Sequence, residues 1–469
     1  MKTLVMKFGG TSLGNVSAIR QTAAIINETR ANWKNLVVVV SAMNGITDSL
    51  IRSARLAAEN KGSDAQEIIN QITVRHYQVI DELITDPSEK ENMLDVLKKR
   101  LDELTSYCRS IQVMGEVTPR GMDVISSLGE RISAPLVAAV VRSLGTPAVA
   151  VEASRFIVTD RTFQNAVPDI AQSCQKINAI LPSHFQAGRV CVVTGFLAAT
   201  PEGVITTLGR GGSDYTAAIL ADCLDASELW IWTDVDGVLS ADPRVVPDAH
   251  PIPEISFAEV GELAYFGARV LHPKTIRPVI NRETPLRVKN TFNPQYPGTR
   301  ITAHSASNRG EITAITTIKD LSIITVEGRG MLGVPGIAAR TFGAVARSGA
   351  SVLMISQSSS EQSICFTIPT VHNDEVLKSI EAEMQLELLR GDIDRVWARD
   401  KMVIVSIIGA GMREVPGVSA RIFGALGKNN INVIAIAQGS SEFSISLVID
   451  EDQGNRAVQA IHKEIFPPA

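Results

Sequence analysis

The stretch Gly209-Arg210-Gly211-Gly212-Ser213-Asp214 follows the apolar run 190–196 and opens a helical pattern over residues 215–224. Glycine lets the backbone adopt turn angles closed to other residues and approach a ligand closely. Amide groups at the start of the following helix favour an anion, and an arginine adds a forked, charged donor for carboxylate or phosphate. These six residues predict an anion-binding turn between a strand and a helix. A flexible connection without a ligand is the alternative if they are considered alone.

Length, composition and charge restrict the class of protein. The 469 residues exceed one hydrophobic core and indicate roughly three domains. The chain is 45% hydrophobic and 20% charged, which is typical of a globular protein, and its net charge of -5 gives no basic footprint for nucleic acid. The longest apolar runs, such as 36–40 and 135–141, are too short to cross a bilayer. We expect no nucleic-acid partner and no membrane span.

Cysteine and histidine usage gives two further expectations. The five cysteines are scattered, odd in number and never in a C-x-x-C pair, which predicts reduced core thiols and a cytoplasmic location. The seven histidines form no H-E-x-x-H or Cys/His cluster, so no metal site is predicted on the protein itself.

Strands alternate with helices along the N-terminal two-thirds of the chain. The run Leu36-Val37-Val38-Val39-Val40 has no polar alternation, which predicts a strand buried on both faces in a parallel sheet covered by helices. Further strands are expected at 4–8, 147–151, 189–194, 228–233 and 285–289. Ligands of such sheets lie beyond the carboxyl ends of the strands. Lys7-Phe8-Gly9-Gly10, Ser41, the 209–214 turn and Thr233-Asp234 all lie there, so we expect one site at this edge.

The C-terminal third contains a duplication. Residues 323–368 align without a gap with residues 404–449, which is a strong signal of a repeated structural unit. Each copy is expected to form a strand, a glycine turn, a helix, two strands and a second helix, and the first copy continues into a strand near 392–398. The strand-like segment 312–318 has no place in the first copy. We predict that it completes the sheet of the second copy, so that the two copies are intertwined.

The strand-end residues fit phosphoryl transfer without a familiar kinase motif. The sequence contains no G-x-x-x-x-G-K-[ST] and no H-R-D or D-F-G set. Lys7 nevertheless places an ammonium on a strand, followed by the amides of Gly9 and Gly10. These groups can hold and neutralise a transferring phosphoryl group.

Together these motifs resemble the aspartokinases of the amino-acid kinase fold, over essentially the whole chain. The matching segments are 7–12, 39–42 with Thr47, 129–131, 207–215, 232–237, 242–244, 266–273 and the paired repeats, which are similar to ACT domains. The resemblance implies an α/β amino-acid-kinase domain over residues 1–305, with a central, mostly parallel sheet between helices. Two intertwined, ferredoxin-like ACT domains are implied over residues 312–398 and 399–469.

The family phosphorylates the β-carboxylate of L-aspartate from ATP and Mg²⁺. The product, 4-phospho-L-aspartate, leads to lysine, threonine, methionine and isoleucine. A carboxylate is already an anion at pH 7, so the acceptor needs no general base. Catalysis then consists of positioning and of offsetting the repulsion between two anions.

The resemblance also implies residue roles. Lys7, Arg210 and Asp214 are the implied catalytic residues, with Asp214 orienting Lys7 and Glu130 binding the substrate ammonium. The implied aspartate-binding set is Ser41, Thr47, Glu130, Arg210, Gly211, Gly212 and Ser213. The implied nucleotide-binding set is Lys7, Gly9, Gly10, Thr233, Asp234, Leu239, Arg244 and Arg269. The family commonly has lysine where this chain has Arg269, and tyrosine where it has Leu239, which leaves nucleotide affinity open.

The repeats imply regulation by an amino acid. Gln357 and Gln438 lie in Q-S-S-S-E and Q-G-S-S-E, a pattern of threonine-sensitive relatives, and a glutamine amide can both donate to and accept from a hydroxyl. The implied effector-binding residues are Gln357, Gln438, Met331, Met412, Ser359 and Ser440. We expect feedback inhibition by threonine, with lysine as the alternative effector. Strand edges of ACT-type sheets predict a homodimer or homotetramer.

Four other expectations concern the class of protein. The C-terminal third has no G-x-G-x-x-G fingerprint, so a monofunctional kinase is expected. A kinase for another acid is disfavoured by Glu130 and the ACT pair. A catalytically inactive amino-acid sensor is disfavoured by the charged set of Lys7, Arg210 and Asp214. A nucleotide-dependent oxidoreductase is disfavoured by the missing fingerprint.

Overall fold

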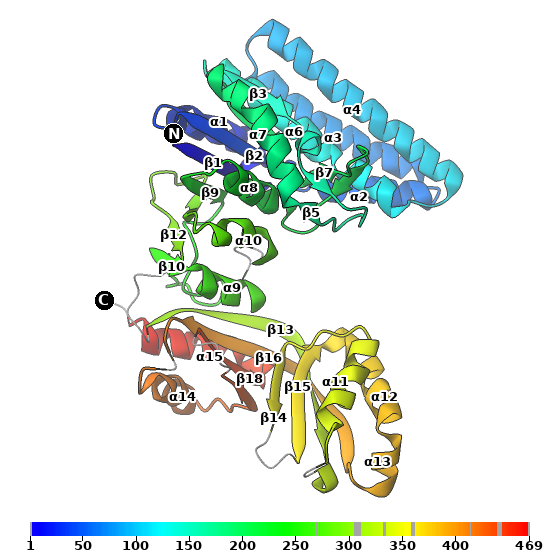
Figure 1. The fold of residues 1–469 in the computed structure, drawn as a ribbon, viewed down its shortest axis with the longest axis vertical. Helices are drawn as coiled ribbons and strands as arrows, with labels where there is room; N and C mark the ends of the chain where they lie inside the picture. The colour runs from blue at the N-terminus through cyan, green and yellow to red at the C-terminus, as the bar shows by residue number, and fades with distance from the viewer. Residues whose placement is uncertain are drawn as a thin grey trace. The chain divides into compact units, whose positions relative to one another are not determined.

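The computed structural model describes residues 2–467 except 269–270, 272, 304–310, 332–333, 358–361, 413 and 439–442. The chain forms two compact units, coloured along the sequence in Figure 1. The first comprises Met1–Val238, Pro251–Phe257 and Val270–Ser305, and the second comprises Leu239–His250, Ala258–Arg269 and Ala306–Ala469. Two short segments from the expected kinase region therefore group with the C-terminal repeats.

An eight-stranded sheet forms the centre of the first unit, in the order β10-β12-β11-β9-β1-β2-β6-β3. Six neighbouring strands, from β11 to β3, are parallel, whereas β12 is antiparallel to β11 and pairs in parallel with β10. The expected mostly parallel sheet is confirmed. Its strands are β1 (Thr3–Phe8), β2 (Asn35–Val40), β3 (Ala148–Val151), β6 (Val190–Thr194), β9 (Glu228–Thr233), β10 (Glu254–Ser256), β11 (Leu286–Asn290) and β12 (Thr299–Thr302).

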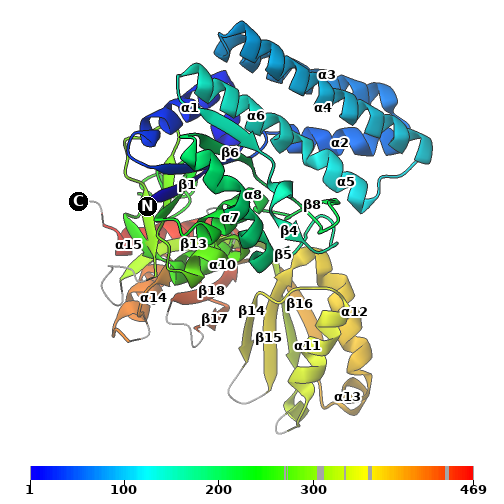
Figure 2. The same cartoon turned by 45° about the horizontal axis from the view of Figure 1, so that its top comes forward.

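Helices cover this sheet, and the two longest, α3 and α4, lie side by side in both views (Figures 1 and 2). A small second sheet of this unit has the strand order β5-β4-β7-β8. The helices of this unit are α1 (Val16–Arg30), α2 (Ile46–Ala58), α3 (Gly62–Leu83), α4 (Pro87–Met114), α5 (Pro119–Ser126), α6 (Leu128–Ser143), α7 (Ile170–Gln186), α8 (Gly212–Cys223) and α10 (Pro273–Asn281). The shorter elements are β4 (Val158–Thr159), β5 (Pro168–Asp169), β7 (Leu197–Ala199), β8 (Ile205–Thr207), η1 (Thr11–Leu13) and η2 (Ala153–Arg155).

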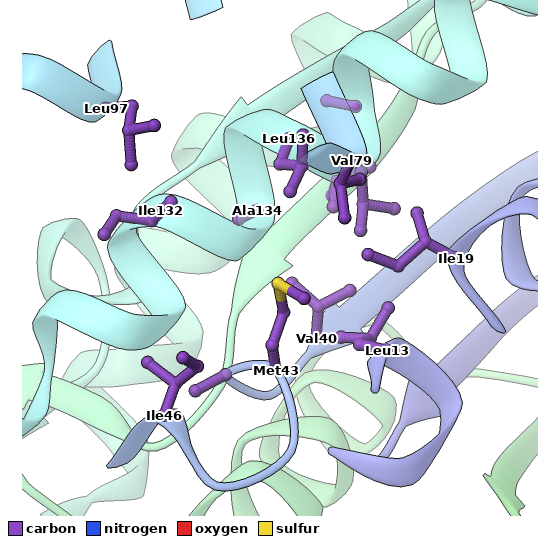
Figure 3. Close-up of a cluster of buried hydrophobic side chains, with 14 of the residues drawn as sticks. Leu13, Ile19, Val40, Met43, Ile46, Val79, Leu97, Ile132, Ala134 and Leu136 are labelled. Atoms are coloured by element: carbon purple, nitrogen blue, oxygen red, sulfur yellow. The ribbon is translucent and has the colours of Figure 1, made fainter. Parts of the chain in front are cut away.

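The hydrophobic core of this unit reaches the carboxyl end of β2. Figure 3 shows Val40 of β2 beside Met43 and Ile46, with Ile132 and other α6 residues facing them. All of these side chains are buried. Burial of this kind contributes on the order of 2 kcal/mol for each large apolar side chain. The residues that follow β2 are thus held by packing, which makes the strand end a rigid support for polar groups.

The region containing α5 and α6 bears on the expectation about apolar runs. The span Pro119–Ser143 is long and apolar enough to cross a membrane by length and composition, although its uninterrupted apolar run is short. In the structure, 83% of its most apolar window is buried inside the protein. We therefore interpret it as a core helix, whose apolar surface is covered by the rest of the unit.

The second unit is built on one antiparallel sheet in the order β14-β15-β13-β16-β18-β17. Residues 312–318 of β13 pair with residues 404–409 of β16, while residues 321–327 of β13 pair with both β15 and residues 395–402 of β16. The expected intertwining is confirmed, because β13 and β16 each extend through both halves of the sheet. Its strands are β13 (Ile312–Glu327), β14 (Met354–Gln357), β15 (Ser363–Pro369), β16 (Arg395–Gly409), β17 (Ala435–Ala437) and β18 (Ser444–Asp450).

The sequence repeat is also a structural repeat. Gly336 precedes the first helix of copy one with φ 94°, and Gly417 precedes the matching helix of copy two with φ 92°. Both angles favour glycine. The other elements of this unit are α9 (Phe257–Tyr265), which begins in the first unit, α11 (Ile337–Arg347), α12 (Asn373–Glu383), α13 (Gln385–Arg390), α14 (Val418–Lys428), α15 (Glu451–Ile465), η3 (Arg329–Met331) and η4 (Thr370–His372).

The segment Leu239–His250 is fastened to the second unit by apolar and polar contacts. Val246 packs in the same core as residues of α14 and α15. Ser240 Oγ lies 2.9 Å from His462 Nε2, and Gln459 Nε2 donates to the Val245 carbonyl at 2.8 Å. These contacts explain why the segment groups with the repeats, although it directly follows β9 and its polar loop in the sequence.

The expectation of reduced thiols is wrong for two of the five cysteines. Cys174 of α7 and Cys223, the last residue of α8, form a disulfide with a Cα–Cα distance of 4.8 Å. Among the described residues Cys108, Cys191 and Cys365 are free. The pairing was hidden in the sequence because the two cysteines are 49 residues apart, and only the packing of α7 against α8 brings them together.

The disulfide predicts a measurable contribution to stability. It closes a loop with a sequence separation of 49, so its reduction should lower the free energy of unfolding by roughly 4 kcal/mol if loop entropy dominates. Urea unfolding with and without a dithiol measures this. Cys174→Ser should show the lower stability under both conditions, and Cys365→Ser should keep the response to dithiol. Equal stability of the wild type in both conditions would contradict the prediction.

Candidate functional site

An ion pair joins the end of β1 to the start of α8 in the first unit. Lys7 Nζ lies 2.6 Å from Asp214 Oδ1, and the side chains are 12% and 17% exposed. Asp214 Oδ1 has no hydrogen-bond partner among the described residues, so the contact is a charge pair without hydrogen-bond alignment. The ammonium N–H groups therefore remain available to another anion. The glycine turn that ends at Asp214 is held close to Lys7.

The glycine turn has a backbone that few other residues could adopt. Gly209 and Gly211 both have φ 74°, and Gly211 precedes α8 without any side-chain cap. The amides of the first turn of α8 are thus not satisfied by a capping side chain, and with the helix dipole they favour an anion. The predicted anion-binding character of the turn fits this geometry.

Ser41 and Ser213 meet at the end of β2. Their hydroxyl oxygens lie 2.9 Å apart, with Ser41 Oγ donating. Sequence reasoning missed Gly195, which follows β6 directly: a Cβ atom there would lie 2.5 Å from Ser213 Oγ. Only glycine permits this close approach of β6 to α8, and the signal was a glycine directly after a buried strand.

Gly9 and Gly10 connect the ends of three strands. The Gly9 amide donates to the Trp232 carbonyl at 3.3 Å, so it is used within the protein rather than being free for a phosphoryl group. A Cβ atom at Gly10 would lie 3.3 Å from the Ala42 carbonyl oxygen. Because both residues are small, the end of β1 can pack closely on its neighbours, whether or not the two glycines also contact a ligand.

Glu130 is a buried carboxylate with one oxygen unpaired. Its side chain lies in the first turn of α6 and is 3% exposed, and Oε1 accepts a hydrogen bond from the Ala42 amide at 3.1 Å. Oε2 has no partner within the described part of the chain. Burial raises the pKa of Glu130 to about 8, and the Ala42 hydrogen bond only partly opposes this. A buried, unpaired carboxylate oxygen suits a cationic ligand such as an ammonium group.

The other predicted substrate-binding residues lie at the same edge. Arg210 is exposed, and within the ranges that the structure describes it makes no ion pair. Thr47 is half-buried in the first turn of α2, which follows the loop after Ser41. Gly212 packs closely on Phe196, since a Cβ atom would lie 2.9 Å from its ring. The free Arg210 guanidinium is therefore available for an anionic ligand.

The predicted nucleotide-binding residues divide between the two units. Thr233 ends β9, and its hydroxyl donates to the Asp234 carboxylate at 3.1 Å. Leu239 and Arg244 belong to the second unit, where the exposed Arg244 pairs with Asp242 at 2.7 Å. Arg269 lies outside the described residues. Thr233 and Asp234 thus lie at the strand-end edge, while the role of the others stays a prediction.

Sequence reasoning missed a polar cluster beside Thr233. Asp236 Oδ1 accepts hydrogen bonds from Asn290 Nδ2 at 2.9 Å and from Asn293 Nδ2 at 3.0 Å. Asn290 ends β11, the neighbour of β9, so the cluster extends the polar edge by one strand. The available signal was an asparagine directly after the predicted strand 285–289. Among the residues that the structure describes, no group of three or more His, Cys, Asp or Glu could hold a metal ion.

A cavity of about 320 Å³ lies in the first repeat of the second unit. It brings together Gln357 and Met331, two predicted effector-binding residues, with the start of α11. The lining residues are Met331, Val334, Pro335, Gly336, Ile337, Ala338, Gln357 and Ile364. In the second repeat Met412 is buried, like Met331 of the first repeat, and Gln438 is exposed, like Gln357. Ser359 and Ser440 lie outside the described residues.

Comparison with known proteins identifies relatives of both units. The sequence profile of the amino acid kinase family matches residues 2–290, and an ACT domain profile matches residues 324–384 and 405–465. The bifunctional aspartokinase/homoserine dehydrogenase 1 of Arabidopsis thaliana is 36% identical over 98% of this chain and 51% of its own length. The chain thus spans about half the length of this curated relative. Aspartokinase 1 of Arabidopsis thaliana is 34% identical over 99% of this chain and 80% of its own length.

Solved structures agree with these relationships. Escherichia coli aspartokinase III in complex with aspartate and ADP has a TM-score of 0.81 and 30% identity, and covers 99% of this chain and 100% of its own. The same enzyme in complex with lysine and aspartate has a TM-score of 0.78, with the same identity and coverage. The likeness therefore extends over both units of the chain.

Glu130 predicts a specific pH dependence of stability. Its pKa is raised from 4.5 to about 8 in the folded protein, so the folded state binds more protons than the unfolded state between these values. The free energy of unfolding should fall as pH rises through this window, and Glu130→Gln should reduce the fall. Urea midpoints at pH 5.5 and 8.5 measure the difference. The exposed Glu82→Gln is the matched control, and equal pH dependence of all three proteins would contradict the prediction.

Proposed function

Because the chain belongs to the aspartokinases of the amino acid kinase family, we propose that it transfers the γ-phosphoryl group of ATP to the β-carboxylate of L-aspartate. The observation that carries this proposal is the grouping of Lys7, Asp214 and Glu130 at one sheet edge with the Arg210 turn. The acceptor oxygen and the phosphoryl group are both negative. The reaction therefore needs cations in place more than it needs a base.

The charges around the site match an amino acid with two carboxylates. The exposed Arg210 guanidinium suits a carboxylate through two parallel hydrogen bonds. The unpaired Glu130 Oε2 suits the α-ammonium group. A dicarboxylic acid without an ammonium group would leave Glu130 buried without a charge partner. Aspartate binding would then favour the ionised form of Glu130 and lower its pKa.

ATP and Mg²⁺ fit the remaining groups of the edge. Lys7 has N–H groups that its ion pair with Asp214 does not use in hydrogen bonds, and these suit a γ-phosphate oxygen. When bound with ATP, Mg²⁺ neutralises phosphate charge and commonly takes only one or two protein carboxylates besides phosphate oxygens and water. Asp234, at the end of β9, is the described carboxylate that we propose for this contact.

A hydroxamate assay tests the reaction and its substrate. With ATP, Mg²⁺ and hydroxylamine, the wild type should form aspartyl hydroxamate from aspartate. It should form almost no succinyl hydroxamate when succinate replaces aspartate. Lys7→Met should lower kcat by about 10²-fold or more, because a charge aimed at the phosphoryl group is lost. Glu130→Gln should raise the KM for aspartate by roughly 10-fold or more through the lost ammonium contact.

The exposed Glu82→Gln variant serves as the control for both changes and should match the wild type. Aspartyl hydroxamate at the level of the enzyme-free reaction would refute the proposed activity. Equal turnover of succinate and aspartate would refute the role of Glu130 but not phosphoryl transfer.

We further propose that the second unit binds L-threonine and inhibits the kinase. The cavity of about 320 Å³ is at the small end of ligand sites, which suits a short amino acid. Amides at the uncapped start of α11 suit its carboxylate, and the Gln357 amide suits its hydroxyl. Lysine is the alternative effector, but its extended ammonium would need a carboxylate that the described lining does not contain.

Threonine titration of the kinase tests this regulation. Gln357→Leu should raise the threonine concentration for half-inhibition by about 10-fold, because one hydrogen bond to the ligand is lost, and should leave uninhibited activity unchanged. Gln438→Leu is the matched variant in the second copy and reports whether that copy also binds. Inhibition by lysine with no response to threonine would refute the effector assignment.

Self-association is proposed from the edges of the second-unit sheet. β14 and β17 are the two edge strands, and they carry the half-exposed Ile355 and Ile436 at matching positions of the repeat. Exposed strand edges favour pairing with another chain. A homodimer or homotetramer through these edges is therefore proposed.

A further inference from the structure

We propose that Asp123 is a positioning residue that holds the Arg210 turn in place for carboxylate recognition. This inference rests on the proposed function for its catalytic consequence. Asp123 lies in α5, away from the strand-end edge in the sequence, and its side chain is fully buried. No motif of the chain singles it out. Its role follows from the backbone groups that it contacts.

The Asp123 carboxylate accepts hydrogen bonds from two separate segments of the chain. Oδ1 accepts from the Thr207 hydroxyl at 2.8 Å, and Oδ2 accepts from the Thr207 amide at 3.1 Å. The Gln164 amide lies 3.0 Å from each oxygen. One side chain thus satisfies the buried Thr207 amide and hydroxyl as well as the part-buried Gln164 amide. Buried polar groups of this kind are costly to leave unpaired.

Both segments lead directly to the glycine turn. Thr207 is the last residue of β8 and lies two positions before Gly209. Gln164 belongs to the loop that packs on the turn from the other side: a Cβ atom at Gly209 would lie 2.9 Å from the Gln164 carbonyl oxygen and 2.9 Å from Asn165 Oδ1. Asp123 therefore holds the strand that enters the turn and the loop that supports it.

The position of Arg210 depends on this backbone. Its side chain is exposed and has no ion-pair partner in the described part of the chain, so no side-chain contact of that kind fixes it. The guanidinium is placed by the turn that carries it. Loss of the Asp123 contacts would release the turn on two sides, and displacements of about 1 Å are enough to weaken recognition severely.

A purely structural role for Asp123 makes a different prediction. If Asp123 only stabilised the fold, its loss would lower the fraction of active enzyme and leave the KM for aspartate unchanged. A positioning role instead raises the KM for aspartate selectively, because Lys7 and Asp214 are held by a separate ion pair. The KM for ATP should therefore change little.

Steady-state kinetics and amide hydrogen exchange of the full chain test the proposal. Asp123→Ala should raise the KM for aspartate by about 10-fold or more and leave the KM for ATP within about twofold. Thr207→Val removes one contact with little change in shape and should raise the KM for aspartate about threefold. In Asp123→Asn the amide oxygen can still accept from the Thr207 amide, and the amide nitrogen can donate to the Thr207 hydroxyl. That nitrogen would also face the Gln164 N–H, which lies 3.0 Å from each carboxylate oxygen. The KM for aspartate should therefore lie between those of the wild type and Asp123→Ala.

Asp160→Ala is the matched control. The Asp160 side chain accepts from the Thr162 and Val167 amides in the same loop, and among the described residues it forms no hydrogen bond with Thr207 or Gln164. Its loss should therefore leave the KM for aspartate within about twofold. Amide exchange in peptides covering residues 205–211 should be faster in Asp123→Ala than in Asp160→Ala.

Each outcome decides the proposal. An unchanged KM for aspartate in active Asp123→Ala overturns it, as does exchange over residues 205–211 equal to that of the wild type. If Asp123→Ala does not fold, Thr207→Val takes its place in both measurements. A wild type that forms no aspartyl hydroxamate refutes the proposed activity, and the exchange measurement then still tests the Asp123 contacts.

Discussion

The ion pair between Lys7 and Asp214 is the contact on which the candidate site depends. It joins a strand end to a helix start, and the two belong to parts of the chain that are far apart in sequence. Because the pair lacks hydrogen-bond alignment, the ammonium is held in position while its N–H groups stay available. The same contact keeps the glycine turn next to β1, so the turn and the lysine form one anion-binding edge.

Around this pair, the site combines two opposite electrostatic conditions. Glu130 is buried with one oxygen unpaired, and burial raises its pKa, so the folded protein bears an electrostatic penalty that a cationic ligand would relieve. Arg210 is exposed, so a carboxylate can reach its guanidinium without displacing an ion-pair partner among the described residues. An amino acid with a side-chain carboxylate can place its ammonium group at Glu130 and a carboxylate at Arg210. A diacid without an ammonium group can only bind Arg210.

The second unit couples its two repeats through the backbone. Strands β13 and β16 each extend through both halves of the sheet, so continuous backbone connects the two proposed effector-binding regions. The segment Leu239–His250 adds a covalent connection: it continues from β9 and its polar loop, yet it packs with Ser240 against His462. Regulation by a bound amino acid therefore has a physical route that begins in the sheet of the second unit.

Patterns along the chain were enough to predict the parallel sheet, the intertwined repeat and the residues that end the strands. The valine run at 36–40, the gap-free alignment of 323–368 and the polar strand ends are local patterns, and they report burial and turn geometry without knowledge of the packing. Three other features became visible only in the folded chain: the bond between Cys174 and Cys223, the close approach of Ser213 to Gly195, and the backbone N–H groups that donate to Asp123. These contacts join residues that are far apart in the sequence. They depend on how helices and loops pack against the strands, and no local periodicity of the sequence specifies that packing.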